Sequence, residues 1–201
     1  MTKVGFKNGD LFQISLPNEL GFAYIKCINL LELDSNAQYP ILIRIYNYRS
    51  LDANVHPEKF INKELILCPL LIAGIIPAIK RGTWKSIGNI PIGKEDAIIP
   101  HYKRPEPNEE NPKEWFYLID ADISKKVKST YEYVKHLETI GSTGSELVGT
   151  KIAMALLRDE GKKIEDYFKL EEYYEKVYYD QVIKIPAYYK QPEFMRGRAL
   201  E

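Results

Sequence analysis

The chain opens with a stretch in which apolar and polar side chains alternate. Phe12, Ile14 and Leu16 are each separated by one polar residue, which is the two-residue period of a strand with one buried face. Pro17 ends this pattern because it has no backbone N–H to donate, and a second apolar stretch begins at Phe22. The spacing therefore predicts an antiparallel β-hairpin around which the first part of the chain is organised.

Further strands are predicted along the first two-thirds of the chain. Residues 41–48 are rich in β-branched and aromatic side chains, residues 60–67 mix apolar and charged positions, and residues 115–119 are all aromatic or aliphatic. Residues 69–81 are interrupted by two prolines and a glycine, so that they fit either a buried strand or a short helix. These segments together predict a strand-rich N-terminal part.

Two segments are predicted to be loops. Residues 82–91 hold two glycines and end in a proline, and their Trp84 is expected to plug one end of the sheet as a core residue. Residues 103–113 hold three prolines among charged side chains. That composition favours an extended surface loop rather than a continued sheet.

The last third of the chain changes to helical spacing. Apolar residues at intervals of three and four predict helices over residues 145–159 and 164–179. Thr143 and Glu146 have the spacing of a capping box before the first of these helices. In residues 125–139 the spacing of Val127, Tyr131, Val134 and Leu137 favours a helix, but the alternation of Tyr131 and Tyr133 allows a strand, and this choice stays open.

Strands first and helices last predict the α+β class. The expected form is a mainly antiparallel, strongly bent sheet or partly open barrel in the N-terminal two-thirds, with the C-terminal helices packed on it. Residues 1–122 are expected to form the β-rich part and residues 123–199 a helical extension on the same core. Residues 200–201 are interpreted as a possible cloning scar.

In two segments the exact residues are more informative than their apolar periodicity. The first reads Gly-Asp-x-Phe-x-Ile-x-Leu-Pro and is followed by Gly-Phe-Ala-Tyr, and the second reads Gly-x-Trp-x-x-Ile-Gly-x-x-Pro. In this order, with the strand at 41–48 between them, they resemble the immunity protein 26 family of bacterial polymorphic toxin systems over roughly residues 5–122. The matching positions, which we expect to be mainly structural, are Gly9, Asp10, Phe12, Ile14, Leu16, Gly21, Trp84, Gly88 and Pro91.

The resemblance implies a function by contact rather than by catalysis. A member of such a family is expected to bind and occlude a cognate protein toxin made by the same bacterium, a nuclease being one candidate class. It needs no cofactor for this. The expected location is the cytoplasm.

The charge balance disfavours a nucleic-acid partner. The chain has 28 Lys and Arg residues against 28 Asp and Glu residues, so that its net charge is zero. Proteins that neutralise phosphates usually carry a clear basic excess or a basic stripe. The sequence shows neither.

The cysteines and the longest apolar run are interpreted as core. Cys27 and Cys68 lie within apolar segments and are expected to be buried free thiols. The apolar run at 65–79 is broken by prolines and is shorter than the roughly 20 residues of a spanning helix. No signal-peptide pattern is visible at the start, so we expect no membrane association.

The residue types that carry most catalysis are not gathered in the sequence. His56, His101 and His136 lie far apart and lack metal-ligand spacing. Asp120 and Asp122 could place two carboxylates on one strand face, as in some metal-dependent hydrolases. Acidic residues at the end of a strand are more often turn residues, and so neither a catalytic nor a metal site is predicted.

Tyrosines and acidic residues are concentrated near the C-terminus and are the best candidates for contact with a partner. Nine of the 15 tyrosines lie from Tyr131 onward, and tyrosine gives large contact area at low entropic cost. Residues 158–180 hold eight acidic and five basic side chains, which would complement a basic toxin surface. The predicted interface residues, within the helix expected at 164–179, are Glu171, Glu172, Tyr173, Tyr174, Glu175 and Tyr178.

Two alternatives remain open at this level. A Gly-Asp-x-Phe-x-Ile opening also resembles small barrel toxins of the toxin–antitoxin kind, which would make this chain a nucleic-acid-binding or RNase-like barrel, and a salt-dependent interaction with RNA would favour that class. The second alternative is a metal-dependent hydrolase that uses Asp120 and Asp122.

Overall fold

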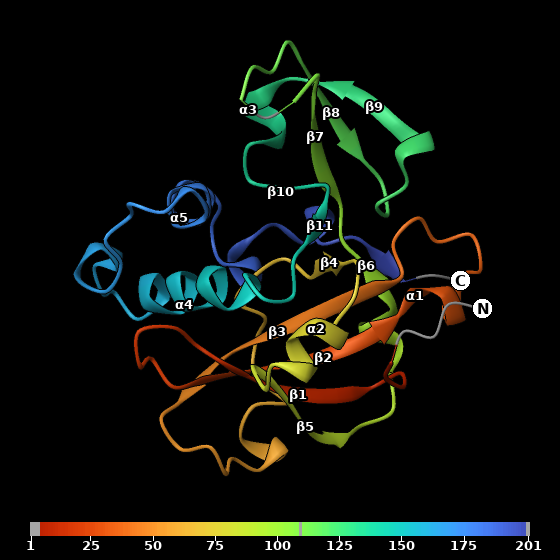
Figure 1. Ribbon diagram of the computed structural model, residues 1–201. Helices are drawn as coiled ribbons and strands as arrows, with labels where there is room; N and C mark the ends of the chain where they lie inside the picture. The colour runs from red at the N-terminus through yellow and green to blue at the C-terminus, as the bar shows by residue number, and fades with distance from the viewer. Residues whose placement is uncertain (1–4, 109, 200–201) are drawn as a thin grey trace.

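The chain is built around an open six-stranded sheet with the strand order β11-β4-β3-β2-β1-β5 (Figure 1). The computed structural model describes residues 5–108 and 110–199, and the possible cloning scar at 200–201 lies outside these ranges. Neighbouring strands are antiparallel except for β11 and β4, which are parallel. The six strands are β1 (Asp10–Ser15), β2 (Phe22–Asn29), β3 (Ile41–Ser50), β4 (Leu70–Ile72), β5 (Trp84–Asn89) and β11 (Ser142–Thr143).

A smaller four-stranded sheet, β10-β7-β8-β9, stands above the six-stranded sheet in Figure 1. Its strands are β7 (Tyr102–Glu106), β8 (Glu114–Leu118), β9 (Lys126–Ser129) and β10 (Glu138–Thr139). A separate two-stranded pair joins β6 (Ile98–Ile99) to β12 (Arg198–Ala199). The second sheet therefore comes from the middle of the chain, after β5 and before β11 of the first sheet.

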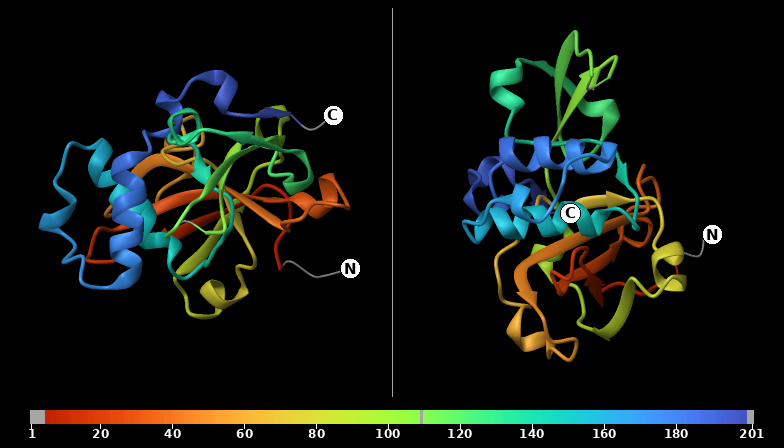
Figure 2. Two further views of the ribbon diagram at one scale, coloured as in Figure 1. Left: turned by 90° about the horizontal axis from the view of Figure 1, so that it is seen from above. Right: turned by 60° about the vertical axis from the view of Figure 1, so that its left-hand side comes forward.

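Two helices of 12 residues each, α4 (Val148–Asp159) and α5 (Tyr173–Lys184), form the helical part. They contact each other on one side of the six-stranded sheet (Figure 2). Within the ranges that the structure describes, no helix is both long and apolar enough to span a bilayer. The shorter helices and 3₁₀ turns are α1 (Leu30–Leu33), α2 (Ile76–Lys80), α3 (Tyr131–Val134), η1 (Pro57–Lys59), η2 (Lys94–Ala97), η3 (Ile123–Lys125), η4 (Ile164–Asp166), η5 (Tyr188–Lys190) and η6 (Glu193–Met195).

The strands β1 to β4 of the six-stranded sheet are largely buried on both faces, whereas β5 is mostly exposed. Phe12, Ile14 and Ile25 share one apolar cluster with the buried face of α4, including Ile152. The opposite face belongs to a second cluster, in which the ring of Tyr24 stacks on Phe60 with centroids 4.6 Å apart. This burial explains why the strands carry long apolar runs.

The α+β class predicted from the sequence is confirmed, with strands first and the two long helices last. The sheet does not close into a barrel, because β11 and β5 are its edges. A register shift between β2 and β3 lies between Ala23 and Ile25. Such irregularities bend a strand and increase its twist.

The predicted hairpin is confirmed, and two of its glycines have a steric reason. Phe12 pairs with Ile25 in the antiparallel ladder of β1 and β2. Gly9 has φ of +86° and Gly21 has φ of +82°, in the left-handed region that favours glycine. A Cβ atom at Gly9 would lie 2.1 Å from a backbone carbonyl oxygen, and one at Gly21 would lie 2.3 Å from another. The backbone packs too closely at both positions for a larger residue.

Two predictions in the first half of the chain were wrong. Residues 60–67 form no named strand and make one isolated bridge, between Leu65 and Tyr46. Their apolar residues serve the core from a loop. Residues 82–91, predicted as a loop, contain strand β5, whose Trp84 pairs with Ile14. The exposed edge of β1 supplies a partner that overrides the weak strand propensity of this segment.

The loop predicted at 103–113 is also partly wrong, because β7 continues to Glu106. Pro105 lies opposite Trp115 in the ladder with β8. On its other side β7 pairs with β10 only at Tyr102 and Lys103. Pro105 therefore occupies an edge position, where a missing backbone N–H is tolerated.

The C-terminal helices are confirmed in kind but shifted in position. The first begins at Val148, and Leu147 at its N-cap makes no side-chain cap bond, so the predicted capping box was wrong. Glu146 instead forms an ion pair with Arg81 at 2.6 Å. The second predicted helix, 164–179, is divided into η4 and α5 by a turn in which Leu170 has φ of +58°. The open segment at 125–139 contains both β9 and α3.

The C-terminal end of α4 is joined to the sheet by Asp159, and this contact predicts an acid-dependent loss of stability. Burial of the Asp159 carboxylate opposes its ionisation. Hydrogen bonds from Lys190 Nζ at 2.9 Å, Asn47 Nδ2 at 2.8 Å and Tyr189 Oη at 3.0 Å outweigh this effect and lower its pKa. A lowered folded-state pKa contributes stability above the unfolded value, about 3.9 for aspartate, and that stability is lost as pH falls through the folded value.

We therefore expect Asp159→Asn to be less stable than the wild type at neutral pH, and we expect this difference to shrink below about pH 4. Urea unfolding at neutral and acidic pH measures both. Tyr189→Phe, which removes one of the three donors, should give an intermediate change. A difference between wild type and Asp159→Asn that is constant with pH would contradict the assignment.

Candidate protein-interaction site

Most of the predicted interface residues lie on one exposed surface at the start of α5. Glu171 and Glu172 are exposed just before the helix. Tyr173 and Tyr174, in its first turn, are 64% and 51% exposed. Their rings meet edge to face, with centroids 5.5 Å apart. The structure thus brings together two carboxylates and two tyrosine rings in contact with solvent.

Two of the predicted interface residues serve the fold instead. Tyr178 is buried, and burial raises the pKa of its hydroxyl to about 12. Its ring lies 5.8 Å from the ammonium of Lys151. Glu175 accepts a hydrogen bond from the backbone N–H of Leu170 at 3.1 Å and so fixes the turn before the helix. Neither the Tyr178 nor the Glu175 side chain is therefore a leading candidate for direct contact with a partner on this surface.

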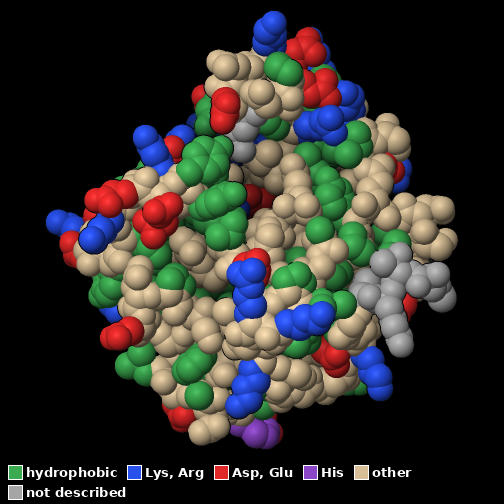
Figure 3. Space-filling model, in the orientation of Figure 1, with side chains coloured by type: hydrophobic (Ala, Val, Ile, Leu, Met, Phe, Trp, Pro, Cys, Tyr) green, Lys and Arg blue, Asp and Glu red, His purple; other side chains and the backbone are tan. Residues whose placement is uncertain are grey.

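A cleft of about 580 Å³ separates α5 from the four-stranded sheet. The sheet contributes Trp115 and α3 contributes Tyr131, whose rings lie 4.9 Å apart. Tyr173 and Val177 contribute the helical wall. Figure 3 shows a hollow bordered by apolar side chains at this place. In this region the predicted interface meets an aromatic-lined cleft.

The two walls of the cleft are connected at the surface. The hydroxyl of Tyr173 donates to Glu110 Oε1 at 3.4 Å. Lys103, on the sheet side, is buried and donates to the carbonyl of Lys135 at 3.2 Å. Its ammonium also lies 5.9 Å from the Trp115 ring. The sheet wall is therefore held rigidly by contacts of its own.

A buried ion pair holds α5 against the rest of the protein. Lys151 of α4 lies 2.5 Å from Glu138 of β10, and both side chains are at most 6% exposed. Lys151 Nζ also donates to Gln181 Oε1 of α5 at 2.8 Å. Three elements, α4, β10 and α5, thus meet at one ammonium group. The position of the helical wall of the cleft depends on it.

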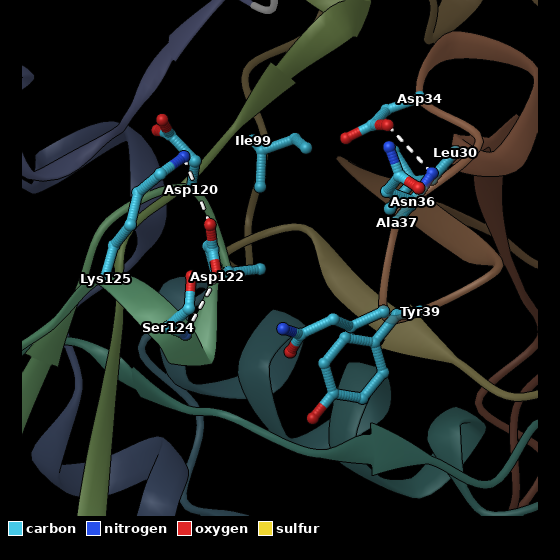
Figure 4. A pocket seen from close by; sticks show the side chains of 12 residues that line it. Leu30, Asp34, Asn36, Ala37, Tyr39, Ile99, Asp120, Asp122, Ser124 and Lys125 are labelled. Atoms are coloured by element: carbon cyan, nitrogen blue, oxygen red, sulfur yellow. Dashed lines mark hydrogen bonds and ion pairs between the residues drawn. The ribbon is translucent and has the colours of Figure 1, made fainter.

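The carboxylates of Asp120 and Asp122 do not share a strand face; both residues lie in the turn after β8, as expected for acidic residues at the end of a strand. Strand β8 ends at Leu118, and Asp120 has φ of +54° in the turn that follows. Asp122 accepts from the backbone N–H of Ser124 at 2.8 Å and pairs with Lys125 at 3.1 Å, in a pocket of about 290 Å³ (Figure 4). Among the described residues, no three His, Cys, Asp or Glu side chains gather as metal ligands would.

The histidines and cysteines are dispersed in the structure as well. His56 is exposed beside Glu58, and His101 is buried against the ring of Tyr117, with centroids 5.1 Å apart. Cys27 and Cys68 are free and buried, as predicted. Burial raises the pKa of both thiols well above its usual value and makes them poor nucleophiles.

Comparison with known proteins identifies the N-terminal part of the chain. Residues 7–111 match the family described as immunity protein 26. The chain belongs to this family. No curated protein and no solved structure shows a significant match.

The family segment contains the two glycines of the hairpin and the buried Trp84, whose ring lies 5.9 Å from Phe12. Asp10 accepts hydrogen bonds from the backbone N–H of Lys7 and from the amide of Asn89, both at 2.8 Å. These contacts explain the hairpin motif structurally. The surface at α5 lies beyond the matched residues.

The cleft itself was not predicted from the sequence. Trp115 was assigned to a strand, and Tyr131 was counted among the C-terminal tyrosines. Gln181 carried no signal, because its importance comes from Lys151, which is 30 residues away in the chain. The density of aromatic residues from Trp115 onward was the available hint.

Proposed function

We propose that this chain is a non-catalytic immunity protein that binds a cognate bacterial toxin and occludes its functional surface. Membership of the immunity protein 26 family is the observation that carries this proposal. The toxin partner follows from what an immunity protein is for. In this proposal the complex forms in the cytoplasm of the cell that makes the toxin.

The surface at the start of α5 is the proposed contact region. Tyr173 and Tyr174 offer rigid aromatic area, and Glu171 and Glu172 offer negative charge beside them. Aromatic residues dominate the hot spots of protein interfaces. Carboxylates at a rim speed association with a basic partner and make the rate depend on salt. Both features suit the occlusion of a toxin whose active surface is basic.

The direct test is titration calorimetry of this protein with the toxin domain encoded beside its gene, at low and high salt. Tight binding that weakens with salt supports occlusion through charge. Tight binding that is indifferent to salt supports immunity through apolar and tyrosine contacts. The proposal fails if wild-type protein and toxin domain do not bind, and binding to RNA is then the next measurement.

The contact surface is tested by the triple variant Glu172→Ala, Tyr173→Ala, Tyr174→Ala. We expect it to bind the toxin domain about tenfold more weakly or worse, mainly through faster dissociation, because two aromatic anchors are lost. The double variant Glu193→Ala, Phe194→Ala is the matched control, since Phe194 is 62% exposed on η6, away from the α5 surface. Equal affinity of the triple variant and wild type would mean that the interface lies elsewhere.

A further inference from the structure

The carboxamide of Gln181 has only one possible orientation at the cleft. Its partner Lys151 carries an ammonium group, which donates hydrogen bonds and accepts none. The oxygen of the amide must therefore face Lys151, and its NH₂ group points the other way. Gln181 lines the cleft, and its NH₂ group has no acceptor among the described residues. The cleft therefore contains a hydrogen-bond donor, the Gln181 NH₂ group, whose direction is fixed by the contact with Lys151.

The donor is held by groups that cannot easily move. Lys151 is itself fixed by the buried carboxylate of Glu138. A side chain with its rotamer locked by such supporting contacts loses little entropy when it binds a ligand. A peptide carbonyl is the commonest acceptor that a protein partner can offer to this NH₂ group.

The walls and the rim define the rest of the occupant. Trp115 and Tyr131 present aromatic surface, which suits an apolar side chain. The ionic groups at the cleft are the carboxylates of Glu110 and Asp180 and the ammonium of Lys184, while Lys103 is buried. With Lys103 included, the described lining residues balance in charge, but the ionic groups that face solvent at the rim are two carboxylates and one ammonium, which suits a basic residue beside the apolar one.

We propose that this cleft receives an extended segment of the toxin, with an apolar side chain against Trp115 and Tyr131 and a backbone carbonyl on the Gln181 amide. A basic residue of the same segment meets the carboxylates at the rim. The inference rests on the proposed function and deepens it. It makes Gln181 a direct contact residue and Lys151 a positioning residue for it. Recognition of extended segments by aromatic grooves and fixed donors is a recurrent mode in proteins.

The decisive variant is Gln181→Glu. The substitution keeps the shape of the side chain and an oxygen for Lys151, but it replaces the NH₂ donor by an acceptor that repels a carbonyl. We expect the affinity for the toxin domain encoded beside the gene to fall by about tenfold or more, although the added negative charge alone would favour a basic partner. Asn62→Asp, on an exposed loop away from the cleft, adds the same charge as a matched control and should leave affinity unchanged.

Overlapping synthetic peptides that cover the toxin domain give a second readout. One peptide with an apolar residue next to a basic residue should compete with the toxin domain for wild-type protein, and not for Gln181→Glu. Thermal unfolding of Gln181→Glu close to that of wild type ensures that the fold is intact. Tyr131→Ala should weaken the binding of the same peptide and leave the binding of the other peptides unchanged.

The outcomes separate this inference from the proposed function. Binding of the toxin domain that is unchanged in both Gln181→Glu and Tyr131→Ala would overturn the cleft proposal and leave the immunity function in place. Failure of wild type to bind the toxin domain would overturn both. A wild-type dimer that dissociates in Tyr131→Ala would assign the cleft to a second copy of this chain instead, and would also overturn the inference.

Discussion

Gly9→Ala is expected to lower the free energy of unfolding by about 3 kcal/mol. A left-handed backbone costs a residue with a Cβ atom roughly 1–2 kcal/mol. The added Cβ would also lie 2.1 Å from the carbonyl oxygen of Ile90. Gly9 cannot move away without loss, because its N–H donates to Cys27 and its carbonyl accepts from Ile90, both at 3.0 Å. Each such backbone bond contributes about 1 kcal/mol.

Substitutions at two other glycines separate the cost of backbone strain from the cost of the steric clash. Gly82 has φ of +74° with no atom within 4 Å of an added Cβ, so Gly82→Ala should show the backbone strain alone. Gly144 has neither a left-handed φ nor a close neighbour, and Gly144→Ala should be neutral or slightly stabilising. Urea unfolding followed by tryptophan fluorescence, to which the buried Trp84 and the half-buried Trp115 both contribute, measures all three. Equal stability of Gly9→Ala and Gly82→Ala would contradict the proposed clash.

The hairpin could be predicted from sequence because its determinants are local. The alternation of Phe12, Ile14 and Leu16 predicted the strand correctly but not its burial, because the intervening Gln13 is only 3% exposed and the strand is buried on both faces. Its glycines and Pro17 mark the turns independently. Local propensity and global fold agree here, and such agreement is what makes a segment readable.

The wrong segments are those where a distant neighbour decides the structure. Strand β5 forms because β1 offers a free edge to it, from some 70 residues earlier in the chain. Phe60 looked like part of a strand, but it leaves the sheet to stack on Tyr24. Pro105 looked like a loop residue, but it pairs with β8 in the part of β7 whose other edge has no neighbouring strand. None of these partners can be read from the segment itself.

The candidate site divides in the same way. That some of the four tyrosines at 173, 174, 178 and 179 would be exposed could be predicted, because residues on two adjacent turns cannot all face one core. The burial of Tyr178 depends on how α5 packs against the rest of the protein. The position of Trp115 across the cleft from Tyr173 likewise depends on where the second sheet lies. Sequence reasoning found the residue types of the surface and missed the cleft beside it.

The buried ion pair beneath the cleft leads to the largest expected effect. Lys151→Met should lower the free energy of unfolding by about 3–5 kcal/mol, because it leaves the carboxylate of Glu138 buried without its cation. Urea unfolding measures this loss, which is a large share of the roughly 5–15 kcal/mol that stabilises a typical domain. Lys128→Met is the matched control, since Lys128 pairs with Glu114 at the surface, and its effect should be much smaller.

The double variant Lys151→Met, Glu138→Gln tests whether the unpaired charge is the cause. Removing the charge of Glu138 together with that of Lys151 should restore much of the lost stability, because a buried neutral amide costs less than a buried carboxylate. A double variant that is as unstable as the sum of the two single variants would instead assign the loss to packing of the Lys151 side chain. The restored protein would still lack the ammonium that orients Gln181. Its affinity for the toxin domain should therefore stay low while its stability recovers, which distinguishes the role of Lys151 in the fold from its role at the cleft.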